Sequence, residues 1–162
     1  MDTHAKLLEM LREFDTAMFV THANDSQLAA RPMAIARVED SGAMWFISDR
    51  SSGKMDDLQS DHCVAITLQN SNQYVSLSGK VNISMDRSKV KELWREGWKV
   101  WFPDGPDDSS ICLLHVVPVF AEYWDNKGNE GLKYILKAGT AYLKGERPKI
   151  EENMNATVSM PA

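Results

Sequence analysis

The sequence predicts a mainly β fold, a six-stranded antiparallel β-barrel with flanking helices. Six segments are short apolar runs or alternate apolar and polar residues with a period of two, as strands do. Most of them are joined by short turns, and the helical segments between them do not alternate regularly with strands. This order of segments favours a small barrel over a doubly wound parallel sheet.

Each predicted element has its own signal in the sequence. The expected strands are 17–21, 32–38, 43–48, 64–68, 74–84 and 111–124. The expected helices, with apolar residues three to four apart, are 7–14, 51–58, 86–98 and 132–143. Gly79 lies in the apolar row of the fifth strand, and Pro118 interrupts the sixth. We therefore expect a bend at Gly79 and a bulge or a sheet edge at Pro118.

The chain length fits a single domain, because domains cluster near ~100–150 residues. We expect this domain to span residues 1–145, with Gly145 placed to end the last helix. Apolar periodicity is lost from Glu146 onward. Residues 146–162 are therefore expected to form a flexible C-terminal tail.

The composition favours a cytoplasmic protein with a small-molecule ligand. The net charge of −5 argues against nucleic-acid and membrane surfaces, which attract clusters of Lys and Arg. No apolar run approaches the roughly 18 residues of a membrane helix, and the N-terminus lacks the features of a secretory signal. Cys63 and Cys112 lie far apart in apolar runs, which favours two buried thiols over a disulfide. The four histidines share no metal-ligand spacing, so no metal site is expected.

The junction between the third strand and its following helix is a candidate anion site. A helix N-terminus offers unpaired amides and a partial positive charge, and here Ser51, Ser52 and Lys54 surround it. Arg31, which we expect to begin the second strand, could supply a second phosphate contact. These residues alone leave two alternatives to a phosphate site open. The serines could form an ordinary helix cap beside an exposed Lys54, and Arg31 could be an ordinary surface residue.

Several short motifs follow one another in order: Arg31-Pro32-Met33, Ser41-Gly42, Trp45-Phe46-Ile47-Ser48, Ser52-Gly53-Lys54 and Gly79-Lys80-Val81. In this order they resemble the FMN-binding split barrel of the pyridoxamine 5′-phosphate oxidase superfamily. The later motifs resemble its general stress protein branch: Leu93-Trp94, Trp98, Trp101-Phe102, Asp107-Asp108, Leu113-Leu114 and Ala121-Glu122-Tyr123-Trp124. The resemblance covers roughly residues 7–143.

The resemblance implies a bound flavin, FMN in the first place and FAD or another flavin as alternatives. The residues that it assigns to the flavin site are Arg31, Pro32, Met33, Ala34, Ile47, Ser48, Ser51, Ser52 and Lys54. Among these, Lys54 takes the role of the phosphate-binding lysine. Gly53 and Ala36 replace two basic residues of the oxidases, so Arg50 or Arg37 could supply phosphate contacts instead.

Two further residues are implied at the site through a second subunit. The oxidases carry a glutamine on the long strand that reaches the partner's site, and here Gln73 lies one residue before the equivalent position, which Tyr74 occupies. Trp101 and Phe102 follow the third helix, where an aromatic plane could stack on a flavin ring of the partner, and Trp101 is taken as the site residue. A core role is the simplest interpretation of Trp94 and Trp98.

The resemblance implies a homodimer with flavin sites at the subunit interface, because a small barrel offers only a shallow cleft for so large a ligand. It favours a flavin-dependent oxidoreductase of unknown substrate. The alternatives are a protein that binds or sequesters flavin without turnover, and a structural module without flavin. The basic, histidine-containing C-terminal motif with which the oxidases hold their substrate is not found, so oxidation of pyridoxamine 5′-phosphate is not expected.

Overall fold

The structure is a computed structural model that describes residues 2–23, 26–127, 145 and 154–160. In chain order its elements are α1 (Thr3–Leu11), β1 (Thr16–His22), β2 (Leu28–Val38), β3 (Met44–Asp49), α2 (Lys54–Ser60), β4 (Cys63–Gln69), β5 (Gln73–Ser84), α3 (Arg87–Leu93), the 3₁₀ helices η1 (Glu96–Val100) and η2 (Gly105–Asp107), β6 (Ile111–Asp125) and β7 (Asn155–Ser159).

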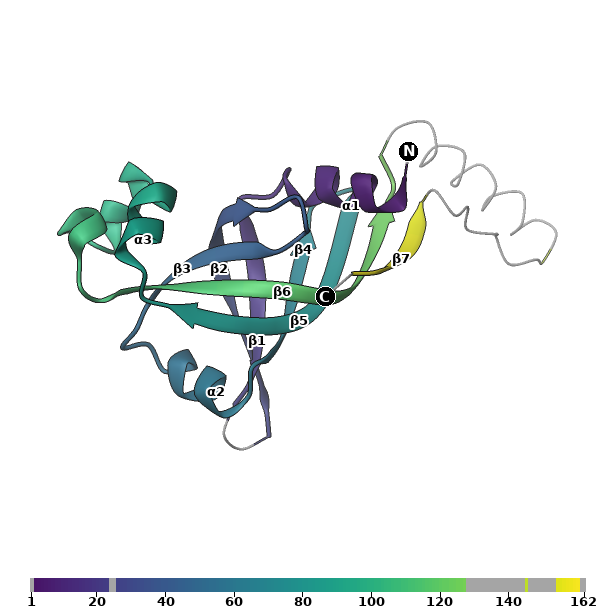
Figure 1. The fold of residues 1–162 in the computed structure, drawn as a ribbon. Helices are drawn as coiled ribbons and strands as arrows, with labels where there is room; N and C mark the ends of the chain where they lie inside the picture. The colour runs from purple at the N-terminus through teal and green to yellow at the C-terminus, as the bar shows by residue number, and fades with distance from the viewer. Residues whose placement is uncertain (1, 24–25, 128–144, 146–153, 161–162) are drawn as a thin grey trace.

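Six antiparallel strands close into a barrel. Their order is β3-β2-β1-β4-β5-β6, and β3 also pairs with the first half of β6, which closes the ring. Apolar side chains alternate inward along these strands and fill the interior. Figure 1 shows α2 at one end of the barrel and α3 beyond the ends of β3 and β6. The predicted six-stranded antiparallel barrel is confirmed.

A bulge divides β6 into two halves. Ser78 pairs with Phe120 and Gly79 with Pro118, which leaves Val119 as the extra residue. A Cβ atom at position 79 would lie 2.3 Å from the carbonyl oxygen of Val117, so only glycine fits this approach. The bulge expected at Pro118 is therefore present. It turns the second half of β6 away from β3.

The second half of β6 pairs with β7, a strand in the segment predicted as a flexible tail. Phe120 to Trp124 pair with Asn155–Ser159, and the amide of Met160 donates to the carbonyl of Val119 (3.1 Å). The tail prediction is wrong for this strand, which belongs to the same sheet as the barrel. The expected helix 132–143 and the remaining tail residues 146–153 lie outside the described residues.

A second, smaller core lies outside the barrel, where α3 and η1 pack on β3 and β6. Its buried members are Ala36, Ile47, Val90, Leu93, Trp98, Phe102, Ile111 and Leu113. Asp86 caps α3 as expected, since its carboxylate accepts from the amides of Ser88 (2.9 Å) and Lys89 (3.3 Å). The helix ends at Leu93, earlier than predicted, and Trp98 lies on η1. The core role expected of Trp94 and Trp98 is confirmed, because both pack in this cluster.

The two cysteines differ in environment. Both are free, but only Cys112 is buried, so the expectation of a buried Cys63 is wrong. Cys63 lies at the beginning of β4, where its side chain faces outward. Within the described ranges, no helix is long and apolar enough to cross a membrane.

Candidate functional site

A cleft of about 530 Å³ lies between β2, the end of β3, the beginning of α2 and the segment after η1. Its lining residues are Pro32, Met33, Ala34, Ile47, Ser48, Asp49, Lys54, Trp101 and Phe102. All of them except Asp49 and Phe102 belong to the site predicted from the sequence. The barrel therefore gathers these residues, from three separate parts of the chain, into one cleft.

One wall of the cleft is aromatic and apolar. Phe102 is buried in the second core, and its amide donates to the carbonyl of Trp98 (3.0 Å). Trp101 beside it is 63% exposed, so its ring is available to a ligand. Ile47 and Met33 supply apolar surface from β3 and β2. Trp101 lines the cleft of its own chain, which differs from its expected place against the partner's flavin.

Lys54 supplies positive charge at the opposite part of the cleft. It is the first residue of α2, half-buried, and its Nζ donates to the hydroxyl of Ser52 (2.8 Å). Burial lowers the pKa of Lys54, and the nearby charge of Arg31 lowers it further. Lys54 forms no salt bridge with any residue of the described ranges. The carboxylate of Asp49 attracts Lys54 without forming a salt bridge, and an anion beside Lys54 would add the direct counterion that the described residues do not supply.

Arg31 stands behind Lys54 and does not line the cleft itself. It lies within β2, opposite Phe19, so its predicted position at the beginning of the strand is wrong. Its guanidinium donates to the hydroxyl of Thr21 (3.1 Å) and lies 3.7 Å from the buried carboxylate of Asp57 on α2. These contacts hold Arg31 in place, and the carboxylate of Asp57 balances its charge. Lys54 has no such ion pair with the described residues.

The two serines before α2 do not cap it. Gly53 occupies the N-cap position without any side-chain hydrogen bond to the helix, so the serine cap considered for this segment is not formed. Ser52 instead accepts from Lys54. Ser51 is exposed, and both its amide and its hydroxyl donate to Oδ1 of Asp49 (2.7 and 2.6 Å). Ser51 therefore shapes the loop and does not line the cleft.

Gln73 is not at this site. It lies at the start of β5 with 1% of its surface exposed, and its side-chain oxygen accepts from Asn70 (3.0 Å). Its side chain faces the barrel interior and does not line this cleft, and contact between Gln73 and the flavin of a partner subunit stays a prediction. Tyr74, the next residue, faces outward and is 42% exposed.

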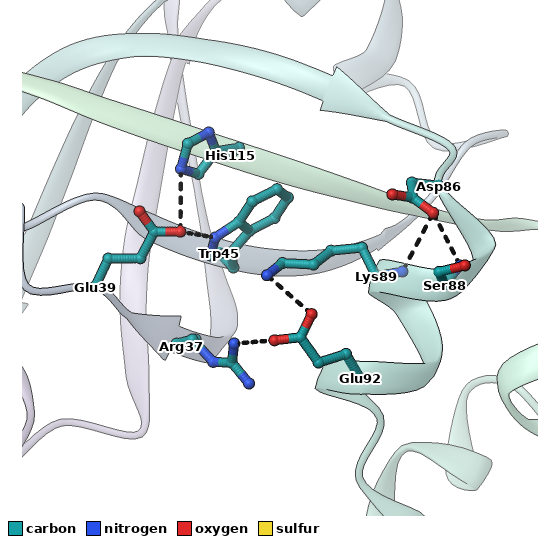
Figure 2. Close-up of polar contacts among 8 residues, drawn as sticks. All are labelled: Arg37, Glu39, Trp45, Asp86, Ser88, Lys89, Glu92 and His115. Atoms are coloured by element: carbon teal, nitrogen blue, oxygen red, sulfur yellow. Dashed lines mark hydrogen bonds and ion pairs between the residues drawn. The ribbon is translucent and has the colours of Figure 1, made fainter.

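Neither proposed substitute for the missing basic contacts lines the cleft. Arg50 lines a separate pocket with Arg87. Arg37 forms an ion pair with Glu92 of α3 (Figure 2). Basic side chains near the cleft are thus Lys54, which lines it, and Arg31 behind it.

Figure 2 shows how polar contacts join α3 to the barrel. Trp45 stacks on His115, with ring centroids 4.1 Å apart, and Nζ of Lys89 lies 5.0 Å from the Trp45 ring. The indole N–H donates to Glu39 (2.5 Å), a hydrogen bond that lowers the pKa of this carboxyl. Because α3 leads directly into η1, these contacts also support the segment that carries Trp101 and Phe102.

Asp49 was missed as a site residue, and Phe102 was considered beside Trp101 but not chosen. Asp49 directly follows Ile47 and Ser48, and its position next to two predicted site residues is the signal that could have found it. Hydrogen bonds from the hydroxyl and the amide of Ser51 lower its pKa, so its carboxyl is ionised at neutral pH. Phe102 lies next to the predicted Trp101.

The fold and the cleft define a small antiparallel barrel with a cleft whose lining combines apolar and aromatic side chains with Lys54 and Asp49. The family model described as pyridoxamine 5′-phosphate oxidase like matches residues 2–149, and the chain belongs to this family. The chain is also 35% identical over 107 residues to Protein bli-3 of Neurospora crassa. That match covers 59% of this chain and 51% of the relative, so the chain spans about half the length of this relative.

Solved structures share the fold and confirm the resemblance to the general stress protein branch. General stress protein 26 from Bacillus anthracis superposes with a TM-score of 0.69 at 22% identity, over 76% of this chain and 94% of that chain. A general stress FMN/FAD binding protein from Xanthomonas citri superposes with a TM-score of 0.66 at 25% identity. This second match covers 77% of this chain and 89% of that chain.

Proposed function

We propose that this chain is a flavoprotein that binds FMN in the cleft between β3, α2 and η1. The observation that carries the proposal is the pairing of an aromatic wall with a half-buried lysine that has no salt bridge within the described residues. The Xanthomonas relative, named as an FMN/FAD binding protein, supports it. In this proposal Lys54 and Ser52 hold the phosphate, while Trp101 and Ile47 contact the ring system.

The electrostatics of the cleft fit a phosphate monoester. Burial disfavours the charged form of Lys54 and lowers its pKa, and the neighbouring charge of Arg31 lowers it further. A phosphate beside Lys54 offsets both effects and supplies a charge-assisted hydrogen bond. Asp57 forms the ion pair with Arg31, which leaves Lys54 as the basic residue of the lining for a phosphate group.

The size and openness of the cleft fit a ligand that a second subunit covers. Its volume lies within the ~300–1,000 Å³ typical of ligand sites. Pro32 and Ala34 of the lining are exposed or half-buried and lie on the outer side of β2. The cleft therefore opens at the edge of the barrel's outer face.

That outer face suits contact with a second copy of the chain. The rows of outward residues that pair across β2, β1, β4 and β5 carry no charge; they are Ala30, Pro32, Val20, Met18, Ala65, Thr67, Ser78 and Ser76. Charged residues are usually depleted at the centre of a protein interface. We propose a homodimer through this face, with each flavin site near the interface.

The flavin supplies the electron and hydride transfer chemistry when bound. The protein's part is to hold the phosphate at Lys54, to orient the ring against Trp101 and to limit access of water. We propose that the activity is that of an FMN-dependent oxidoreductase. One observation favours the alternative, flavin binding without turnover: the titratable residues of the described lining, Asp49 and Lys54, are both charged and leave no neutral acid or base.

A comparison of FMN with riboflavin tests the proposed binding mode. Riboflavin has the same ring and side chain but no phosphate. Lys54→Met is expected to weaken FMN binding by about 10- to 100-fold, the effect of losing a charge-assisted hydrogen bond. It should change riboflavin binding less than threefold. Flavin fluorescence quenching measures both, and an equal loss for the two ligands would contradict a phosphate site at Lys54.

Reduction of the bound flavin separates the enzyme from the binding protein. The FMN-loaded protein is mixed without oxygen with NADH or NADPH, and the flavin absorbance is followed. Rapid bleaching, with recovery when an acceptor is added, supports the oxidoreductase. A tightly bound flavin that stays oxidised with every donor supports sequestration without turnover.

A further inference from the structure

Asp49 lines the cleft but has no role in the proposed contacts with the phosphate or with the ring system. It is the last residue of β3 and lines the cleft together with Ser48. Along the chain it lies between Ile47, on the apolar part of the lining, and Lys54, on the cationic part. A ligand that fills the cleft therefore shares it with the carboxylate of Asp49 as well as with Ile47 and Lys54.

The carboxylate of Asp49 has one oxygen committed to the protein and one available. Oδ1 accepts from both the amide and the hydroxyl of Ser51, at 2.7 and 2.6 Å. Oδ2 has no hydrogen bond or ion pair with the described residues. Because two hydrogen bonds from Ser51 fix the orientation of the carboxylate, Oδ2 is a preorganised acceptor on a residue that lines the cleft.

A free carboxylate oxygen is unfavourable beside a bound phosphate unless the ligand also offers hydrogen-bond donors. Like charges repel, and an acceptor without a donor loses its hydration when a ligand covers it. A ligand with hydroxyl groups between its phosphate and its ring resolves both problems. Hydroxyls donate readily to a carboxylate, and such bonds are among the stronger ones in proteins.

We propose that Asp49 is a specificity-determining residue that selects phosphate ligands with a polyol chain next to the phosphate. For FMN this chain is the ribityl group, whose hydroxyls donate to Oδ2 of Asp49. The inference rests on the proposed flavin function and deepens it. Phosphorylated ring compounds without a polyol leave this acceptor unpaired and bind more weakly.

Three flavins that differ by one part each test this inference. FMN carries ring, ribityl chain and phosphate, riboflavin lacks the phosphate, and lumiflavin lacks both chain and phosphate. Asp49→Ala is expected to weaken FMN and riboflavin by the same factor, about tenfold or more, and lumiflavin less than twofold. Asp49→Asn keeps an acceptor for Ser51, so it is expected to weaken FMN and riboflavin binding less than Asp49→Ala does.

Asp56→Ala is the matched control. It removes a carboxylate from the first turn of α2 that is exposed and does not line the cleft. All three flavins should bind this variant as they bind the wild type, and a thermal melt of each variant verifies folding.

Each other outcome overturns the inference in a recognisable way. Equal losses for all three flavins show that Asp49 only shapes the loop. Tighter FMN with unchanged riboflavin shows that the residue only repels phosphate. A wild-type protein that binds no flavin overturns the proposed function together with this inference, whereas a wild type that binds FMN and an Asp49→Ala variant that matches it overturn this inference alone.

Discussion

Lys54 combines three circumstances that disfavour a cation. It is half-buried, it lies near Arg31, and it begins a helix whose N-terminus carries a partial positive charge. The first two lower its pKa below the ordinary value of 10.5. Without an anion, the charged side chain therefore costs folding free energy.

Lys54→Met is expected to stabilise the ligand-free protein at pH 7 by about 0.5–1 kcal/mol, since it removes a cation from a helix start and keeps the apolar stem. Urea unfolding with and without FMN measures the effect. FMN should stabilise the variant less than the wild type at the same FMN concentration. Lys80→Met, at an exposed site on β5, serves as the control and should change neither value.

The free-energy cost of the charged Lys54 side chain predicts that the stability of the protein depends on pH. The folded protein holds the Lys54 proton less tightly than the unfolded chain, so this residue's cost is full below its folded pKa. The cost fades as pH rises from that pKa to the ordinary 10.5. The advantage of Lys54→Met over the wild type should shrink between pH 7 and pH 10. A variant that is less stable than the wild type at pH 7 contradicts this account of the site.

Gly79 and Gly53 should respond very differently to alanine. At position 79 a Cβ would lie 2.3 Å from one backbone oxygen of β6 and 2.8 Å from a second backbone atom, and neither atom can move without breaking the strand pairing. At position 53 nothing lies within 4 Å. We expect Gly79→Ala to cost about 3 kcal/mol or more and Gly53→Ala to stay within about 1 kcal/mol of the wild type. Urea unfolding of both variants measures this, and equal effects contradict the bulge.

The contacts between α3 and the barrel make Glu39 sensitive to acid. The Trp45 indole lowers its pKa, so Glu39 contributes stability above its ordinary value of 4.5 that is lost as pH falls through the lowered value. Trp45→Phe is expected to destabilise the protein by about 1 kcal/mol at pH 7 and less at pH 3. The unfolding free energy at the two pH values measures this.

Arg37→Ala is the comparison for this element. It breaks only the exposed pair with Glu92, which is worth at most about 0.5 kcal/mol. A loss for Trp45→Phe that does not change with pH contradicts the role assigned to Glu39.

Strands differ in how easily their alternation is recognised in the sequence. The alternation over 74–84 predicted β5 almost to its ends, because its inward face fills the barrel. β7 alternates as well, since Met154, Val158 and Met160 are buried and Val158 and Met160 pack in the barrel core. Its signal was missed because the strand has only five residues and one of its inward residues is the small Ala156. The small residues Ala29 and Ala30 gave no apolar signal for the first part of β2. Arg31 was therefore expected at the start of the strand, although it lies within it.

At the scale of the whole molecule, the uncharged outer face predicts a dimer. Light scattering at micromolar concentration should give twice the mass of the 162-residue chain. Ser78→Lys places a charge within this face and is expected to give monomers and weaker FMN binding. Ser41→Lys, in the exposed turn between β2 and β3, should remain dimeric. A wild-type monomer with flavin bound contradicts the shared site.

The site could be predicted in part because its residues sit in short motifs, while its geometry depends on the closed barrel. The order of motifs found Lys54 and Trp101, and the fold brings them to one cleft. Gln73 lies one residue before the position that carries the glutamine of the oxidases, and one residue along a strand reverses the side of a side chain, so Gln73 faces inward and not into the cleft of its own chain. The sequence could not show that Trp101 lines the cleft of its own chain, because its position depends on the 3₁₀ helix η1 that precedes it.

The central claim is that the cleft holds FMN, and the absorption spectrum of the protein tests it most directly. The purified protein is incubated with FMN, separated from free ligand by gel filtration and then denatured for mass spectrometry of whatever it releases. With FMN held in the cleft, we expect a flavin spectrum with about one FMN released per chain, and a strongly reduced amount from Lys54→Met. A colourless protein that releases no flavin would contradict it.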